Sequence, residues 1–170
     1  MNLLHNQPGA HHVTRAGLRM LGMEAMPVPT ISLQSFLHDD AVVWEQVNLE
    51  RSGVEVLTER EMRVAERALG EDHLVRIPPH ASTGTSTHRP DLLFRMNGKA
   101  AWHAVEVELA PKSEARLSAI LTGYLSSPSF IAVVYCVPTT NLIERVRRVG
   151  SSVGLGDRLK VVVTQQRAAA

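Results

Sequence analysis

Three carboxylates stand in an apolar part of the sequence where the interiors of β-strands are expected. Within RPDLLFRMNGKAAWHAVEVELAPKS, Asp91 opens one apolar run, and Glu106 and Glu108 lie inside the next. Carboxylates that converge beside a core repel one another unless a positive group lies between them. Mg²⁺ suits this role because it takes oxygen ligands and often uses only one or two protein carboxylates. We therefore expect Asp91 and Glu106 to hold Mg²⁺ or Mn²⁺, together with the carbonyl oxygen of Val107.

Basic residues follow the acids directly. Lys112 stands at the start of an expected helix over residues 113–126, and Arg116 lies one turn further along it. Either side chain could hold a phosphate or polarise an attacking water molecule. The competing interpretation is that EVE is the solvated face of an edge hairpin, with Lys112 as a local ion partner worth less than about 1 kcal/mol.

The acids are brought together by an expected hairpin around the turn NGK, formed by residues 91–96 and 101–109. Strand alternation places Glu106 and Glu108 on one face and the intervening valine on the other. The turn pairs residues near 94 with those near 101–103. Continued along the ladder, this register brings Asp91 toward both glutamates.

The remaining elements indicate an α/β fold. Amphipathic spacing predicts a helix over residues 32–52, and the capping box of Thr58 and Glu61 predicts another over 59–69. A short helix is expected between Thr14 and Gly22. VEVL and HLVRI indicate short strands, and PPHASTGTSTHRP indicates a loop. The continuous apolar runs FIAVVYCV and LKVVVT, separated by the helical segment TNLIERVRRVG, are typical of a mixed central sheet flanked by helices.

Composition sets the broad class of protein. The chain has 170 residues, 44% of them hydrophobic, which is enough for one compact domain. Its net charge of +1 gives no bulk attraction to nucleic acid, so any such contact needs a local basic patch. The single cysteine, Cys136, lies in an apolar run and excludes an intramolecular disulfide. We expect a cytoplasmic protein with no membrane span.

The order of these motifs resembles the PD-(D/E)xK nuclease-like superfamily. RPD, WHAVEVELAPKS and the helix ending in Tyr124 look like its core, whose α-β-β-β-α-β order matches residues 59–136. The segment from HDDAVVWEQVNLERSG to LTGYL has a closer resemblance, to the replication-relaxation proteins of plasmids and integrative elements. HHVTRAGLRMLG looks like the end of the winged helix that precedes the nuclease-like domain in that family. The resemblance, over roughly residues 11–136, implies an N-terminal extension at 1–30, a nuclease-like domain at 31–166 and a tail at 167–170.

The resemblance also implies roles for particular residues. Asp91 matches the Asp of the motif and Glu106 its Asp/Glu, whereas Glu108 stands where the superfamily has Lys. Lys112 could supply the missing amine from the helix. Acids on the preceding helix match a position where family members often carry a further acidic residue; these are Glu59, Glu61 and Glu66, with Glu61 already used in the capping box.

Two functions remain open at this level. The first is a Mg²⁺-dependent endodeoxyribonuclease of a plasmid or mobile element, acting in replication, relaxation or transfer, with Glu108 or Lys112 positioning the water. The second is an inactive nuclease-like module that binds DNA or another protein, such as a relaxase or replication protein. Either could form a homodimer through the hairpin edge and the helix that carries Trp44. The expected phosphate contacts are Lys112, His88, Arg116, Arg145, Arg147 and Arg148.

Overall fold

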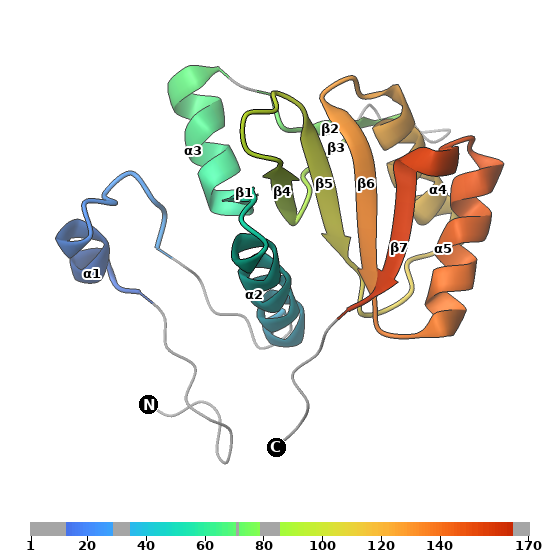
Figure 1. Cartoon of the computed structure of the whole chain (residues 1–170), viewed down its shortest axis with the longest axis horizontal. Coiled ribbons are helices and arrows are strands. Elements are labelled where there is room, and N and C mark those ends of the chain that lie inside the picture. Colours follow the sequence, from blue (N-terminus) through green and yellow to red (C-terminus); the bar gives the residue numbers. More distant parts are fainter. Residues whose placement is uncertain (1–12, 29–34, 71, 79–85, 165–170) are drawn as a thin grey trace, which may run out of the picture.

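A mixed five-stranded sheet forms the centre of the protein. The computed structural model describes residues 13–28, 35–70, 72–78 and 86–164 (Figure 1). The strand order is β1-β4-β5-β6-β7, with antiparallel pairing from β1 to β5 and parallel pairing from β5 to β7. The strands are β1 (Glu55–Thr58), β4 (Leu92–Arg95), β5 (Trp102–Val107), β6 (Phe130–Val137) and β7 (Leu159–Val163). The expected α/β class, with a mixed sheet flanked by helices, is confirmed.

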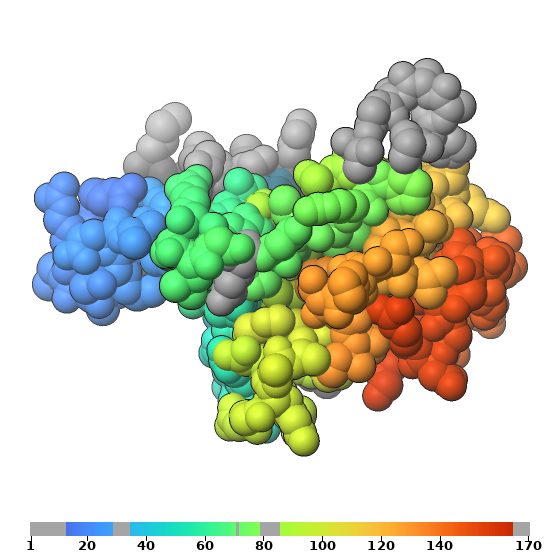
Figure 2. All heavy atoms as spheres, turned by 90° about the horizontal axis from the view of Figure 1, so that it is seen from above, coloured from blue at the N-terminus to red at the C-terminus, as the bar shows by residue number. Residues whose placement is uncertain are grey.

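Helices cover the two faces of this sheet unequally. α2 (Phe36–Arg51) packs on one face, where its Ala41 joins a cluster that includes Leu92, Val105 and Val107. The larger cluster on the other face includes residues of α3 (Glu59–Leu69), α4 (Glu114–Ser126) and α5 (Thr140–Ser152). Figure 1 shows α2 on the near side of the sheet, and α4 and α5 beyond it. The short helix α1 (Arg15–Met20), capped by Thr14, lies at the opposite end of the molecule from α5 and β7 (Figure 2).

The β4–β5 hairpin has the register that the sequence predicts. Phe94 pairs with His103 and Leu92 with Val105. Gly98, in the turn, has a φ of +78°, a conformation that L side chains rarely adopt. Successive residues of β5 therefore alternate between the two faces: Val105 and Val107 pack on the α2 side, and Ala104 on the α4 side.

The expected loop 78–90 contains a strand, and the expected strand 73–77 lies outside the main sheet. β2 (Val75–Ile77) pairs with β3 (Ser86–His88) as a separate two-stranded ribbon. The ribbon packs on α4, since an added Cβ at Gly123 would lie 2.6 Å from Val75 Cγ1 and 2.9 Å from the Arg76 carbonyl oxygen. β1 precedes α3 in the chain and takes the place beside β4, so that the three consecutive strands expected after α3 do not form the sheet core.

The other boundaries agree closely with the sequence. α3 has the Thr58–Glu61 capping box and ends before Gly70. The first residues of the helix expected over 32–52, at 32–34, lie outside the described residues, and α2 is described from Phe36 onward. The tail expected at 167–170 also lies outside the described residues. A 3-10 turn, η1 (Gly156–Arg158), leads into β7. None of the helices in the described part of the chain has the length and apolarity to cross a lipid bilayer.

Candidate functional site

Asp91 lies against the end of β5, as the hairpin register predicts. Its backbone N–H donates to the Val105 carbonyl oxygen at 3.1 Å. Its Oδ2 atom accepts a hydrogen bond from the Val107 N–H at 2.7 Å and lies 3.4 Å from His38 Nε2. The side chain of Asp91 is therefore fixed beside the peptide group that separates Glu106 from Glu108.

Glu106 is buried on the α4 side of the sheet. Its residue surface is only 2% exposed, and its Oε1 atom lies 2.6 Å from His88 Nε2. The Tyr124 hydroxyl, on α4, donates a hydrogen bond to the same oxygen. A buried carboxylate needs such partners, because unpaired charge in a core is strongly destabilising. Glu106 is thus held by β3 from one direction and by α4 from another.

Glu108 lies just beyond β5 and is also 2% exposed. Lys112 satisfies both of its oxygens: the Lys112 backbone N–H donates to Oε1 at 3.0 Å, and Lys112 Nζ lies 3.0 Å from Oε2. The amine remains partly accessible, since the Lys112 side chain is 31% exposed. The structure therefore places an amine at the third carboxylate, as the resemblance implies for Lys112.

EVE is not the solvated face of an edge hairpin, although the ion pair with Lys112 expected in that interpretation is present. β5 is the central strand of the sheet, and both glutamates are buried. The charges are balanced within the protein, because each carboxylate has one basic partner: His38 at Asp91, His88 at Glu106 and Lys112 at Glu108. When both histidines are protonated, their charges and that of Lys112 offset the mutual repulsion of the acids without a bound cation.

Two histidines in this cluster are biased toward the charged form. The hydrogen bond to Asp91 raises the pKa of His38 from 6.5 to about 9, against the opposing effect of burial. Burial also lowers the pKa of His88, but the hydrogen bond and charge of Glu106 outweigh it and give a net increase. The sequence analysis missed His38, because its only signal is the HDD segment on α2, far from Asp91 in the chain.

A second tyrosine completes the cluster from β6. Tyr135 pairs in register with Glu106, belongs to the α4-side core and has no exposed surface. Its hydroxyl has no hydrogen-bond partner among the described residues. Burial, followed by the charges of Glu106, Glu108 and Asp91, raises the pKa of Tyr135 well above its usual value, so the hydroxyl keeps its proton.

Asp91 and Glu106 are the residues that could hold a divalent cation. Among the described residues, their side-chain contacts go to Oδ2 and Oε1, which leaves the second oxygen of each carboxylate for a ligand. The unpartnered Tyr135 hydroxyl beside them is a further polar group able to contact such a ligand. No set of three or more His, Cys, Asp or Glu side chains in the described residues is arranged to hold a metal ion. A cation here would therefore rest on two carboxylates, a backbone carbonyl and water, a set that fits Mg²⁺.

The expected basic residues do not form one patch. Arg145 donates from Nη2 to the Lys112 carbonyl oxygen at 2.6 Å, which brings it to the cluster. Arg148 pairs with Glu114 at 3.1 Å, and Arg147 donates to the Val161 carbonyl oxygen on β7. Arg116 is exposed and makes no side-chain ion pair with the described residues. We call Lys112, Arg116 and Arg145 the basic rim of the cluster.

Acids of α3 lie apart from these three. Glu66 forms a salt bridge with Arg89 at 2.6 Å, and Glu59 pairs with Arg63 at 2.6 Å. Glu61 is used in the capping box, as expected. The Glu66–Arg89 pair joins α3 to the segment immediately before Pro90 and Asp91, so its contact with the cluster is indirect.

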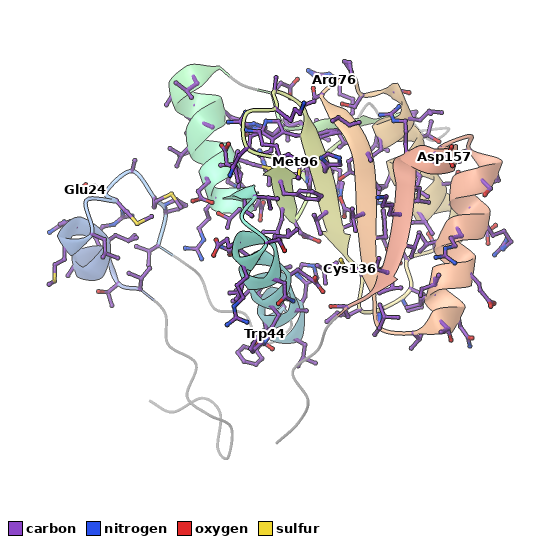
Figure 3. All side chains as sticks on the ribbon, in the orientation of Figure 1. Glu24, Trp44, Arg76, Met96, Cys136 and Asp157 are labelled. Atoms are coloured by element: carbon purple, nitrogen blue, oxygen red, sulfur yellow. The ribbon has the colours of Figure 1, made fainter. Side chains whose placement is uncertain are left out.

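Two other features lie outside this chemistry. Burial raises the pKa of the Cys136 thiol to about 12, so this cysteine is a buried apolar residue as expected, on β6 (Figure 3). An open hollow of about 390 Å³, lined in part by Phe130 and Ile131, lies at the start of β6, whereas Glu106 pairs near its end. Arg158 borders the hollow, but its guanidinium is occupied by backbone carbonyl oxygens.

Comparison with known proteins gives no relative for this chain. No family model, curated protein or solved structure matches it. The function must therefore be argued from the geometry of the cluster.

Proposed function

We propose that this protein is a nuclease-like domain that acts on DNA phosphodiesters, with Asp91 and Glu106 as ligands of Mg²⁺ or Mn²⁺. The observation that carries the proposal is the convergence of Asp91 with Glu106 and Glu108 at the end of β5, next to the amine of Lys112. Glu106 and Glu108 are each only 2% exposed, and carboxylates are rarely buried to this extent unless they are paired or bind a metal. The setting we propose is the replication, relaxation or transfer of a plasmid or mobile element.

The arrangement of the sheet supports a PD-(D/E)xK core. The resemblance implies the order helix–strand–strand–strand–helix–strand. Along the chain, with α3 and the β2–β3 ribbon set aside, the same order is given by α2, β1, β4, β5, α4 and β6. α3 and the β2–β3 ribbon are then an insertion between β1 and β4. This assignment replaces the match to residues 59–136, in which the strand at 73–77 was expected in the sheet.

Each residue of the cluster has a distinct task in this proposal. Asp91 and Glu106 would offer their second oxygens, Oδ1 and Oε2, to the cation. Bound there, Mg²⁺ would supply Lewis-acid activation of the phosphodiester and of water. Glu108 and Lys112 form an ion pair in which Lys112 Nζ lies 3.0 Å from Glu108 Oε2, and the partly exposed amine could orient the attacking water.

The basic rim provides the contacts to DNA. Lys112 contacts Glu108, Arg145 contacts the Lys112 carbonyl oxygen, and Arg116 lies in the first turn of α4; there the three would hold phosphate oxygens and position the strand. Because the net charge of the whole chain is only +1, such binding depends on this local group and is sensitive to salt. His88 is turned inward to Glu106 and would contact DNA only if that pair opened.

A second function is favoured by the internal charge balance. Since His38, His88 and Lys112 already neutralise the three acids, the same fold could bind DNA or a protein partner without a cation and without cleavage. A relaxase or replication protein is the kind of partner that we expect in that case. α2 offers a surface for a partner or a second copy, since Leu37 and Val43 are exposed and Trp44 points away from the sheet (Figure 3).

Calorimetric titration with Mg²⁺ and Mn²⁺ tests the first function. The wild-type protein is compared with the double variant Asp91→Asn, Glu106→Gln, which keeps the shape of both side chains. Glu55→Gln serves as the control, because Glu55 is an exposed acid on β1 paired with Arg95. The same samples are assayed for nicking of supercoiled plasmid.

The two functions predict different results. A metal-dependent nuclease binds the cation and nicks DNA in the wild type and the control, and loses both properties in the double variant. A binding module shifts DNA in metal-free buffer and never nicks it. Nicking that persists in the double variant would place the chemistry elsewhere in the chain.

A further inference from the structure

The Tyr135 hydroxyl is the unusual group of the carboxylate cluster. Tyr135 pairs with Glu106 across the parallel strands β6 and β5, and paired residues of adjacent strands point to the same face of a sheet. The side chain has 0% exposed surface, yet its hydroxyl has no partner among the described residues. A buried hydroxyl without a partner is destabilising, because it loses water and gains no hydrogen bond in exchange.

The neighbouring tyrosine provides a direct comparison. Tyr124 is equally buried, at 1% exposed, but its hydroxyl donates to Glu106 Oε1. The two hydroxyls lie in the same layer between the sheet and α4, and both carry raised pKa values, first because of burial and then because of Glu106. Among the described residues, the Tyr124 hydroxyl has an acceptor and the Tyr135 hydroxyl has none.

We propose that Tyr135 is a positioning residue. Its hydroxyl donates a hydrogen bond to an oxygen of the ligand bound at Asp91 and Glu106, so this inference rests on the proposed function. Such an oxygen belongs to the hydration shell of a divalent cation or to a DNA phosphate. The hydroxyl is a neutral donor among three carboxylates, so it can hold a ligand oxygen without adding charge. Within the described residues this donor has no acceptor, and it gains one when the ligand binds.

This proposal predicts opposite effects on stability and on binding. Removal of the hydroxyl in Tyr135→Phe leaves the ring in place and removes only the unpaired group. The variant should therefore melt at the same or a higher temperature than the wild type without ligand. Its affinity for the ligand should fall by about 10-fold, the size expected for one hydrogen bond to a charged or polarised oxygen.

Two titrations distinguish the two sources of the oxygen. The first uses Mn²⁺ alone, and the second uses a short DNA duplex in the presence of Ca²⁺. Weaker Mn²⁺ binding by Tyr135→Phe assigns the hydroxyl to the hydration shell of the cation. A loss confined to the DNA titration assigns it to a phosphate oxygen. Tyr124→Phe is the matched control, and it should lower the melting temperature because Glu106 loses a donor.

The outcomes that overturn the inference are separate from those that overturn the function. Unchanged affinity of Tyr135→Phe in both titrations, with normal binding by the wild type, removes the role of Tyr135 and leaves the proposed function intact. A lower melting temperature of Tyr135→Phe without ligand also overturns it, because the hydroxyl would then have a partner in the free protein. Failure of the wild type to bind either probe removes both proposals.

Discussion

The Oδ2 atom of Asp91 accepts a hydrogen bond of 2.7 Å from the backbone N–H of Val107. This bond joins the start of β4 to the end of β5, at the peptide between the two glutamates. Val107 is 2% exposed, so its N–H lies in the protein interior, where it donates to the Asp91 carboxylate. Asp91 is therefore a structural residue of the hairpin as well as a proposed ligand.

Asp91→Ala should destabilise the metal-free protein by about 1–3 kcal/mol, the cost of a buried donor left without an acceptor. Asp91→Asn keeps an acceptor oxygen and should lose less. Urea unfolding measures both variants. Asp40→Ala, an exposed acid on α2, is the control and should change stability by no more than about 0.5 kcal/mol. Equal stability of Asp91→Ala and the wild type would contradict the role of this hydrogen bond.

His38 should make stability depend on pH in the alkaline range. Its pKa of about 9 in the folded protein lies above the ordinary value of 6.5, so the folded protein keeps a proton that the unfolded chain releases. Its contribution is full below about pH 6.5 and is lost as the pH rises through about 9. Because the His38 side chain is 38% exposed, solvent screening limits the contribution to the order of 1 kcal/mol.

The measurement compares urea unfolding of the wild type and His38→Gln across that pH range, in buffer with a chelator. The stability difference between them should shrink as the pH rises. A direct check is the titration of the His38 imidazole by NMR. A midpoint near 6.5 would show that the contact with Asp91 is absent in solution.

Local signals explain what the sequence predicts correctly. The capping box at Thr58 and the NGK turn act between near neighbours in the chain, so α3 and the pairing of Phe94 with His103 could be read from residue spacing. The alternation of side chains along β5 could also be predicted from residue spacing. The burial of Glu106 could not, because it depends on β5 being the central strand of the sheet. That order depends on β1, a short strand that pairs with β4 across the whole of α3 and the ribbon.

Contacts between distant segments explain what the sequence analysis missed. β3 forms only because Val75 pairs with His88 over a long loop of turn-forming residues, and this pairing carries His88 to Glu106. His38 and Tyr135 reach the acids from α2 and β6, and no spacing rule links either residue to Asp91. Of the three basic partners, Lys112 could be predicted from the motif as a local ion partner, whereas the histidines at Asp91 and Glu106 could not.

Gly123→Ala should displace the β2–β3 ribbon from α4. The added Cβ would meet Val75 Cγ1 at 2.6 Å and the Arg76 carbonyl oxygen at 2.9 Å, and a backbone atom cannot rotate away. The expected loss of stability is about 1–3 kcal/mol, typical of overpacking. Because the ribbon holds His88 against Glu106, the NMR signal of the His88 ring should shift as well.

Gly150→Ala is the matched control for this change. Gly150 also lies inside a helix, α5, and its added Cβ would lie 2.2 Å from Leu159 Cδ2, the far end of a flexible side chain that can rotate, with no backbone atom among its three nearest neighbours. The gain in helix propensity is the same at both positions, about 1 kcal/mol. Gly123→Ala should therefore be the less stable variant, and equal stability of the two would argue against close packing of the ribbon on α4.

The basic rim should be recognisable from the salt dependence of DNA binding. Arg116→Gln removes an exposed charge beside the cluster, and Arg147→Gln removes a charge whose guanidinium contacts Val161 on β7. Both variants have the same net charge, so any difference between them reports position. If Arg116 contacts a phosphate, its loss should reduce the slope of log K against log salt by about 1, with no such change for Arg147→Gln. Equal effects of the two substitutions would mean that DNA is attracted by overall charge, and a reversed order would place the DNA along β7.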